Sequence, residues 1–194
     1  MTLTTQAQAI VYEWVSSEVL RKHCGAVAAS MAYVAAKTNQ DVDLWEATGW
    51  LHDMDYERHP TLEDAENAHP FVGVRFLREN GWSEDICRAI LSHADYSGVS
   101  RDSMLEKTLY AVDELSSFVV AVALVRPSKN IADVDVAAVK KKMKDKAFAR
   151  AVNRDDIAHG AAGLGVEVDD LITDVIAALT ARATTLGIAG VPTP

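Results

Sequence analysis

Apolar residues recur every three or four positions along most of the chain. This spacing is typical of helices with one buried face, and no run of alternating apolar and polar residues bounded by hairpin turns interrupts it. We therefore predict an all-α fold. The predicted helices cover residues 4–20, 24–38, 43–53, 66–79, 83–94, 103–125, 133–150, 153–163 and 168–186.

Capping signals support several of these helices. Residues 43–46 and 103–106 both fit the capping box, in which a Ser or Asp side chain and a Glu three positions later bind the free amides of a first turn. Ser83 and Asn153 precede acidic residues, which favour a helix N-terminus. Asn80-Gly81 is typical of a helix end.

Length and composition indicate one globular domain. The 194 residues are 49% hydrophobic and 24% charged, and no Gly/Ser-rich linker divides them. We expect a single domain over residues 1–186, followed by a frayed tail over 187–194. Residues 118–125 form the longest apolar run, far short of the roughly 20 residues that cross a bilayer.

Cellular location and partners are constrained by the same features. The first residues lack the cationic and apolar parts of a secretory signal, so we expect a cytoplasmic protein in which Cys24 and Cys87 are free thiols. A net charge of −9 argues against general nucleic-acid binding. The cationic stretch within residues 140–154 reads better as a solvated helix face than as a phosphate-attracting rim. A homo-oligomer is compatible with this sequence.

Several polar side chains fall on apolar helix faces. Asp113 follows Leu109 by four positions and precedes Ser116 by three. His93 follows Ile90 by three positions and Ile86 by seven. A buried carboxylate or imidazole is destabilising unless another group pairs with it. The residues placed inward by such spacing, or at a helix end, are His23, His52, Asp53, His69, His93 and Asp113.

Any one of these histidines on its own is better explained as a hydrogen-bonded core residue. Together, four inward histidines and two carboxylates on separate helices favour metal binding, because one divalent ion satisfies several such groups at once.

The ordered pattern resembles the HD superfamily of metal-dependent phosphohydrolases. The match consists of His23, then His52-Asp53, then Asp113, within contexts such as the stretches 49–57, 69–77 and 111–115. It covers about residues 20–130 and implies an HD-type helical bundle with additional C-terminal helices. Met54-Asp55 replaces the Ile-Gly of the HDIG signature, and the Gly-Tyr-Pro element of cyclic-dinucleotide phosphodiesterases is missing.

The resemblance implies a binuclear centre that hydrolyses a phosphomonoester or phosphodiester of a nucleotide or similar small molecule through a metal-activated water. One ion is expected on His23, His52, Asp53 and Asp113, and a second on His69 and His93 with Asp53 shared as the catalytic bridge. One or two ions of Fe, Mn, Co, Ni or Zn suit such mixed ligands.

For other residues near these motifs, the sequence indicates a functional role less clearly. Arg126 and Lys129 are candidates for binding the substrate phosphate, with a surface-loop role equally open. Asp55 and Glu57 are candidates for orienting water or a ligand histidine, although helix-end solvation is favoured. Glu114 points away from the side of the helix that carries Asp113, so we do not count it as a ligand. Tyrosines are expected in or near the core.

Two alternatives remain open. The same ligands occur in HD-fold di-iron oxygenases, and a non-catalytic module that binds a nucleotide or a partner around a structural metal is the third hypothesis.

Overall fold

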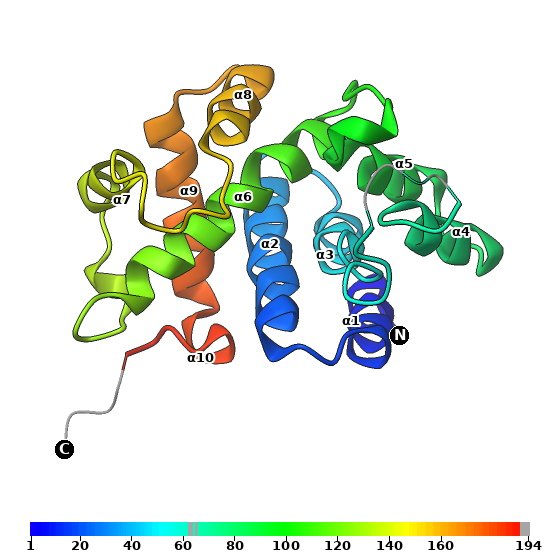
Figure 1. Ribbon diagram of the computed structural model, residues 1–194, viewed down its shortest axis with the longest axis horizontal. Coiled ribbons are helices and arrows are strands. Elements are labelled where there is room, and N and C mark those ends of the chain that lie inside the picture. The colour runs from blue at the N-terminus through cyan, green and yellow to red at the C-terminus, as the bar shows by residue number, and fades with distance from the viewer. Residues whose placement is uncertain (62–63, 65, 191–194) are drawn as a thin grey trace.

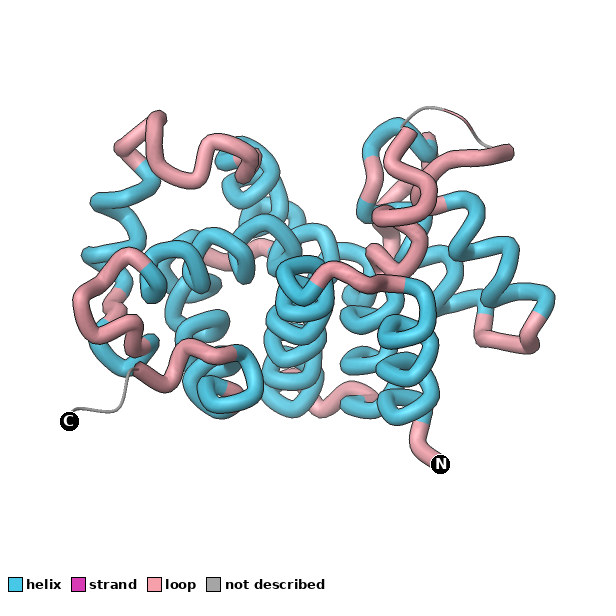
Figure 2. The backbone as a smooth tube through the Cα atoms, turned by 60° about the horizontal axis from the view of Figure 1, so that its bottom comes forward, coloured by secondary structure: helices cyan, strands magenta, loops and turns pink. Residues whose placement is uncertain are grey.

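The computed structural model describes residues 1–61, 64 and 66–190, and this part of the chain is helical without a β-strand (Figures 1 and 2). The all-α prediction is therefore confirmed. The helices are α1 (Leu3–Trp14), α2 (Glu18–Lys37), α3 (Val42–Leu51), α4 (Phe71–Glu79), α5 (Glu84–His93), α6 (Met104–Leu124), α7 (Val136–Met143), α8 (Arg154–Leu164), α9 (Val168–Ala181) and α10 (Ala183–Leu186).

Helix α6 crosses the middle of the molecule and packs against members of two groups of helices, α1 to α5 and α7 to α10 (Figure 1). Helix α2 packs against α3, α6 and α9. One apolar cluster forms around α6 and includes Phe118 and Ile157. A second cluster joins α1, α3, α4 and α5 and includes Leu51 and Ile86.

Local capping signals fixed several helix starts as predicted. Ser83 and Asn153 are the N-cap residues of α5 and α8. At the start of α6, Ser103 accepts from the Glu106 amide and the Glu106 carboxylate accepts from the Ser103 amide, so this capping box is confirmed. Gly81 follows α4 with a φ of 77°, the left-handed conformation expected after a helix end.

The capping box predicted at residues 43–46 is wrong. Asp41 caps α3, and Asp43 instead accepts hydrogen bonds from the backbone amides of Leu3 and Thr4, at 2.8 and 3.0 Å. These bonds, led by the one from Thr4, hold the pKa of Asp43 below its usual value. Asp43 thus binds the free amides at the start of α1 and ties that helix to α3.

The single helix predicted over residues 4–20 is interrupted between Trp14 and Glu18. Ser17 caps α2, and the Glu57 carboxylate accepts from the amides of Ser16 and Ser17, both at 2.9 Å. Glu57 therefore stabilises this break in the chain rather than orienting a ligand histidine.

Differences also occur at the C-terminal end. Helix α7 ends at Met143, earlier than predicted, and the helix predicted over 168–186 breaks at Arg182. Ile188 is fully buried and its carbonyl accepts from the Ile131 amide at 2.8 Å. The expectation of a frayed tail is therefore wrong for residues 187–190, whereas 191–194 lie outside the described residues.

Close contact between α2 and α3 positions the later site. A Cβ atom on Gly49 would lie 2.6 Å from the Ala28 Cα atom, so only glycine allows this approach. Cys24 and Cys87 are buried free cysteines, as predicted. Among the described helices, none is both long and apolar enough to cross a membrane.

Candidate metal centre

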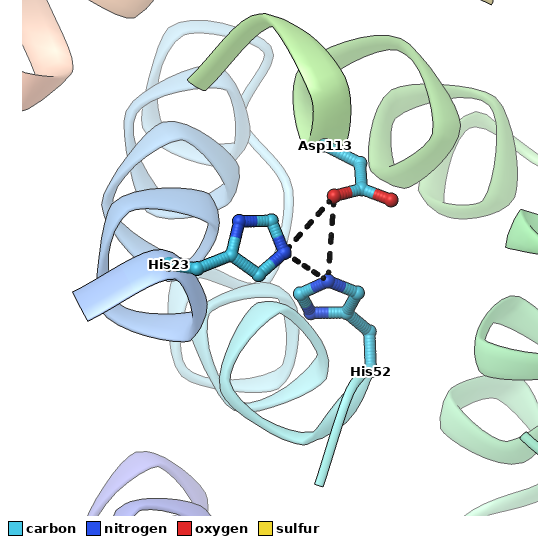
Figure 3. A group of neighbouring side chains, drawn as sticks. All are labelled: His23, His52 and Asp113. Atoms are coloured by element: carbon cyan, nitrogen blue, oxygen red, sulfur yellow. Dashed lines mark hydrogen bonds and ion pairs between the residues drawn. The ribbon is translucent and has the colours of Figure 1, made fainter. Parts of the chain in front are cut away.

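Three side chains from α2, the end of α3 and α6 point toward one another (Figure 3). The Nε2 atom of His23 lies 3.0 Å from the Nε2 atom of His52 and 3.2 Å from the Oδ1 atom of Asp113. The distance between His52 Nε2 and Asp113 Oδ1 is 3.4 Å. His52 is fully buried, so this group of ligand atoms is largely removed from solvent.

A second group lies beside the first and consists of Asp53, His69 and His93. The Nε2 atoms of His69 and His93 are 3.2 Å apart, and they lie 3.4 and 3.6 Å from the Oδ1 atom of Asp53. His69 belongs to the turn before α4, which begins at Phe71 and not at the predicted residue 66. His93 is the last residue of α5.

Asp53 connects the two groups through its two carboxylate oxygens. Its Oδ1 atom faces the second histidine pair, whereas its Oδ2 atom lies 3.3 Å from His23 Nε2 and 3.6 Å from His52 Nε2. One carboxylate therefore faces two separate pairs of imidazoles.

The hydrogen bond at the Nδ1 atom of each imidazole determines whether the Nε2 atom, which faces the centre, carries a proton or a free lone pair. Each Nδ1 atom has a partner that can accept a hydrogen bond from it: the Gly49 carbonyl for His52, the Asp55 carboxylate for His69, the Ile90 carbonyl for His93 and the Ser117 hydroxyl for His23. With the proton held at Nδ1, the Nε2 atom carries a bare lone pair. Two such lone pairs 3.0 Å apart repel each other unless a cation lies between them.

The donor set fits transition-metal binding in its chemistry and its spacing. Ligands held about 2.1 Å from one ion lie about 3.0–3.4 Å from one another in octahedral or tetrahedral arrangements. The donor separations of 3.0 to 3.4 Å in the first group lie within this range, and those of 3.2 to 3.6 Å in the second group extend just beyond it. Imidazole with carboxylate suits Fe, Mn, Co, Ni or Zn.

Without a metal ion, the carboxylates of Asp53 and Asp113 favour the protonated form of His23. Burial lowers the pKa of His23, but hydrogen bonds and charge from Asp113 and Asp53 outweigh it and raise the pKa to about 10. Burial acts to raise the pKa of Asp113, yet the neighbouring His52 and His23 hold it well below the usual range. The centre therefore favours a cation among its ligand atoms.

A family model described as the HD domain matches residues 20–123, which is more than half of the chain. This chain belongs to the HD domain family. The resemblance inferred from His23, His52-Asp53 and Asp113 is thereby confirmed, as is an HD bundle extended by C-terminal helices.

Among curated proteins, Ribonuclease Y of Cutibacterium acnes is 30% identical to this HD protein over 73 residues. The aligned part covers 38% of the chain and 13% of the ribonuclease, so the chain spans only a small part of that relative. No solved structure matches.

Asp55, which departs from the HDIG signature, has a defined role in the HD bundle. Its side chain is 1% exposed, so the favoured explanation of helix-end solvation is wrong. The Oδ1 atom accepts from His69 Nδ1 at 2.7 Å, and the Oδ2 atom accepts from the Gly73 amide at 2.6 Å. Asp55 thus orients one histidine of the second group and binds a free amide in the first turn of α4.

The expectation that Arg126 and Lys129 bind substrate is not supported by their position. Both follow the end of α6 at Leu124, which lies about 17 Å along the helix axis from Asp113 at a rise of 1.5 Å per residue. Neither side chain lines the cleft over the centre. Proximity to the end of a ligand-bearing helix does not imply proximity to the ligand.

A cleft of about 430 Å³ opens over both groups of ligand atoms. Its walls include side chains that the sequence reasoning missed or placed in the core. These additional residues are Tyr56, Asp95, Tyr96, Tyr110, Asn153 and Asp156. A signal for the tyrosines was present in the sequence, because each of them lies three positions from Asp53, His93 or Asp113 and so falls on the same side of its turn.

Glu114 also lines the cleft, although it belongs to neither ligand group, as predicted. Burial raises the pKa of Glu114 to about 7, and the adjacent Asp113 carboxylate adds to the rise. The carboxylate is thus placed where water stabilises its charge poorly.

Proposed function

We propose that this HD protein is a metal-dependent phosphohydrolase that cleaves a phosphomonoester or phosphodiester of a nucleotide or similar small metabolite. Asp53 is the proposed catalytic residue at the bridge between two metal ions. The proposed ligands are His23, His52, Asp53 and Asp113 for one ion and Asp53, His69 and His93 for the other.

The observation that carries this proposal is the placement of the Asp53 carboxylate between two histidine pairs. Its two oxygens face different pairs, at 3.3 to 3.6 Å from each Nε2 atom, as a bridging ligand requires. Two bound divalent ions supply a nucleophilic water at neutral pH and offset negative charge on a phosphoryl group.

The hydrogen-bond partners of the histidines hold the ligand atoms in place, and the net charge of the centre favours phosphate. Hydrogen bonds at each Nδ1 atom fix the rings with Nε2 toward the centre, so little rearrangement is needed on binding. Two divalent ions against two carboxylates leave a formal charge of +2, which a phosphate dianion neutralises.

The relative's name supports phosphoester chemistry but not its polymer substrate. A ribonuclease cleaves phosphodiester bonds, and the similarity covers the HD region. Proteins that bind RNA chains neutralise phosphates with Lys and Arg, whereas this chain has a net charge of −9. A cleft of about 430 Å³ suits a small molecule better.

The test is turnover by purified protein loaded anaerobically with Mn²⁺ or Fe²⁺, across a panel of phosphomonoesters and phosphodiesters. We expect phosphate or alcohol release at more than 100 times the rate of an Asp53→Ala variant that keeps its helical circular dichroism. Glu167→Ala, at an exposed position before α9, should retain full activity.

Two results would contradict this proposal. Metal-replete protein that hydrolyses no ester in the panel would remove the hydrolase assignment. Turnover that requires oxygen and consumes it stoichiometrically would identify an HD-fold oxygenase instead.

A further inference from the structure

Carboxylates other than the proposed ligands line the cleft over the centre. Besides the proposed ligands, Glu114, Asp95 and Asp156 line it, and no Lys or Arg does so among the described residues. The guanidinium of Arg101 is ion-paired with Asp95 and lies 3.5 Å from the ring centroid of Tyr110. Arg101 therefore compensates Asp95 and leaves the other two carboxylates unpaired.

Glu114 and Asp156 differ from Asp95 in having no ion-pair partner in the described chain. Asp156 accepts a hydrogen bond from the Tyr110 hydroxyl at 2.9 Å through Oδ1, which leaves Oδ2 available. Both side chains are only partly exposed. A half-buried carboxylate without a cation is destabilising, and a positively charged ligand removes that penalty.

Charge balance distinguishes the ligand cluster from the rest of the cleft lining. The formal +2 of the ligand cluster with two divalent ions would match the phosphate dianion of a monoester. The two unpaired carboxylates, which line the same cleft, would then repel the further phosphates of a nucleoside triphosphate.

We propose that the substrate of this centre is a phosphate ester whose alcohol carries a positively charged amine. This inference rests on the proposed hydrolase function and narrows its substrate class. Glu114 and Asp156 bind the ammonium group, while Tyr56 and Tyr96 supply aromatic surface on which an organic cation packs well. The phosphate end is held at the ligand cluster.

The kinetic test compares two esters of nearly the same shape on the Mn²⁺-loaded protein. Phosphocholine carries a quaternary ammonium, and its carbon isostere, dimethylbutyl phosphate, lacks that charge. We expect kcat/KM to be at least about tenfold higher for phosphocholine, and Glu114→Gln to reduce this ratio about tenfold. Asp156→Asn should act in the same direction, whereas Glu167→Gln should leave the ratio unchanged.

Binding measured by calorimetry separates failure of this inference from failure of the hydrolase proposal. Choline should bind the wild-type protein at least about tenfold more tightly than dimethylbutanol, and Glu114→Gln should abolish the difference. Ester hydrolysis without any preference for the cation would overturn the inference and leave the hydrolase assignment standing. If the protein bound choline selectively but hydrolysed no ester, the hydrolase assignment would be overturned, whereas recognition of an ammonium group by the cleft carboxylates would be supported. Equal binding of the two alcohols would overturn the inference.

Discussion

Asp55 illustrates how one side chain couples a ligand histidine to a helix. Its two oxygens accept from His69 and from the Gly73 amide, and a Cβ atom on Gly73 would lie 3.0 Å from the Asp55 carboxyl carbon. Gly73 therefore allows the carboxylate to approach the start of α4. The orientation of the His69 ring depends on this contact.

Replacing Asp55 with Asn should lower metal affinity about 10- to 100-fold while the fold is retained. The amide has one acceptor oxygen, so it cannot accept from both His69 and Gly73, and its NH₂ group would face one of the two donors. Competition with a chromophoric chelator measures the affinity. Glu57→Gln, whose parent carboxylate binds only the amides before α2, is the matched control. Unchanged affinity in Asp55→Asn would show that Asp55 has no part in metal binding.

The proposed ligands could be predicted from the sequence because each is a polar group on an apolar helix face or at a helix end, where burial without a partner is destabilising. Asp113 lies on an apolar face, and His93 continues the apolar face formed by Ile86 and Ile90, so their positions required partners. Arg126 had no such constraint, and only its place after the ligand helix suggested a role. The role of Asp55 depended on a contact with Gly73, 18 positions away, which no local pattern reports.

At the scale of helices, the contact between α2 and α3 sets the distance between His23 and His52. Gly49 faces the backbone of Ala28, and any side chain there would meet the Ala28 Cα and N atoms at 2.6 and 2.8 Å. These are backbone atoms, so the contact cannot be relieved by a rotamer change. The two helices would have to separate.

We expect Gly49→Ala to lower the free energy of unfolding by about 1–3 kcal/mol, as overpacking does in a dense core. Gly163→Ala in α8 is the matched control, because a Cβ atom there meets nothing within 4 Å. That variant should gain up to about 1 kcal/mol through helix propensity and a less flexible unfolded chain. Urea denaturation of both variants in chelator provides the comparison. Equal effects of the two substitutions would contradict the close-packing argument.

Helix boundaries were predictable where the capping groups were local. Ser103 and Glu106 are three positions apart and formed the expected capping box. Asp43 and Glu57 instead bind amides about 40 positions earlier in the chain, so the sequence pattern assigned Asp43 to the wrong helix. The four-residue spacing of Val11, Val15 and Val19 also continues across the break before α2 and concealed it.

Across the whole molecule, the buried apolar side chains form two clusters, and we expect them to hold the bundle without a metal. Phe118, Leu109 and Leu115 are fully buried around α6, and Leu51 and Ile86 are fully buried in the second cluster. The apolar periodicity predicted the all-α class. The placement of α6 between two groups of helices was not predictable, because periodicity states which face is buried and not what covers it.

Metal removal should therefore weaken the protein without unfolding it. Protein treated with a chelator should keep its helical circular dichroism, and Mn²⁺ at 100 times its dissociation constant should raise the free energy of unfolding by about 2.7 kcal/mol. Thermal and urea melts with and without Mn²⁺ measure the shift, and Asp53→Ala should show a smaller one. Loss of helical signal on chelation alone would contradict a self-sufficient core.

Because helices from both ends of the chain pack around α6 and α3, shortening the chain would expose apolar surface. A fragment trimmed to the family-matched segment 20–123 would retain every proposed ligand. It would also lose α1, which packs on α3, together with α8 and α9, which pack on α6. Ile157, Ile172 and Val175 would no longer shield the apolar side of that central helix. The boundary drawn by family likeness and the boundary needed for a soluble, expressible unit are thus different in this protein.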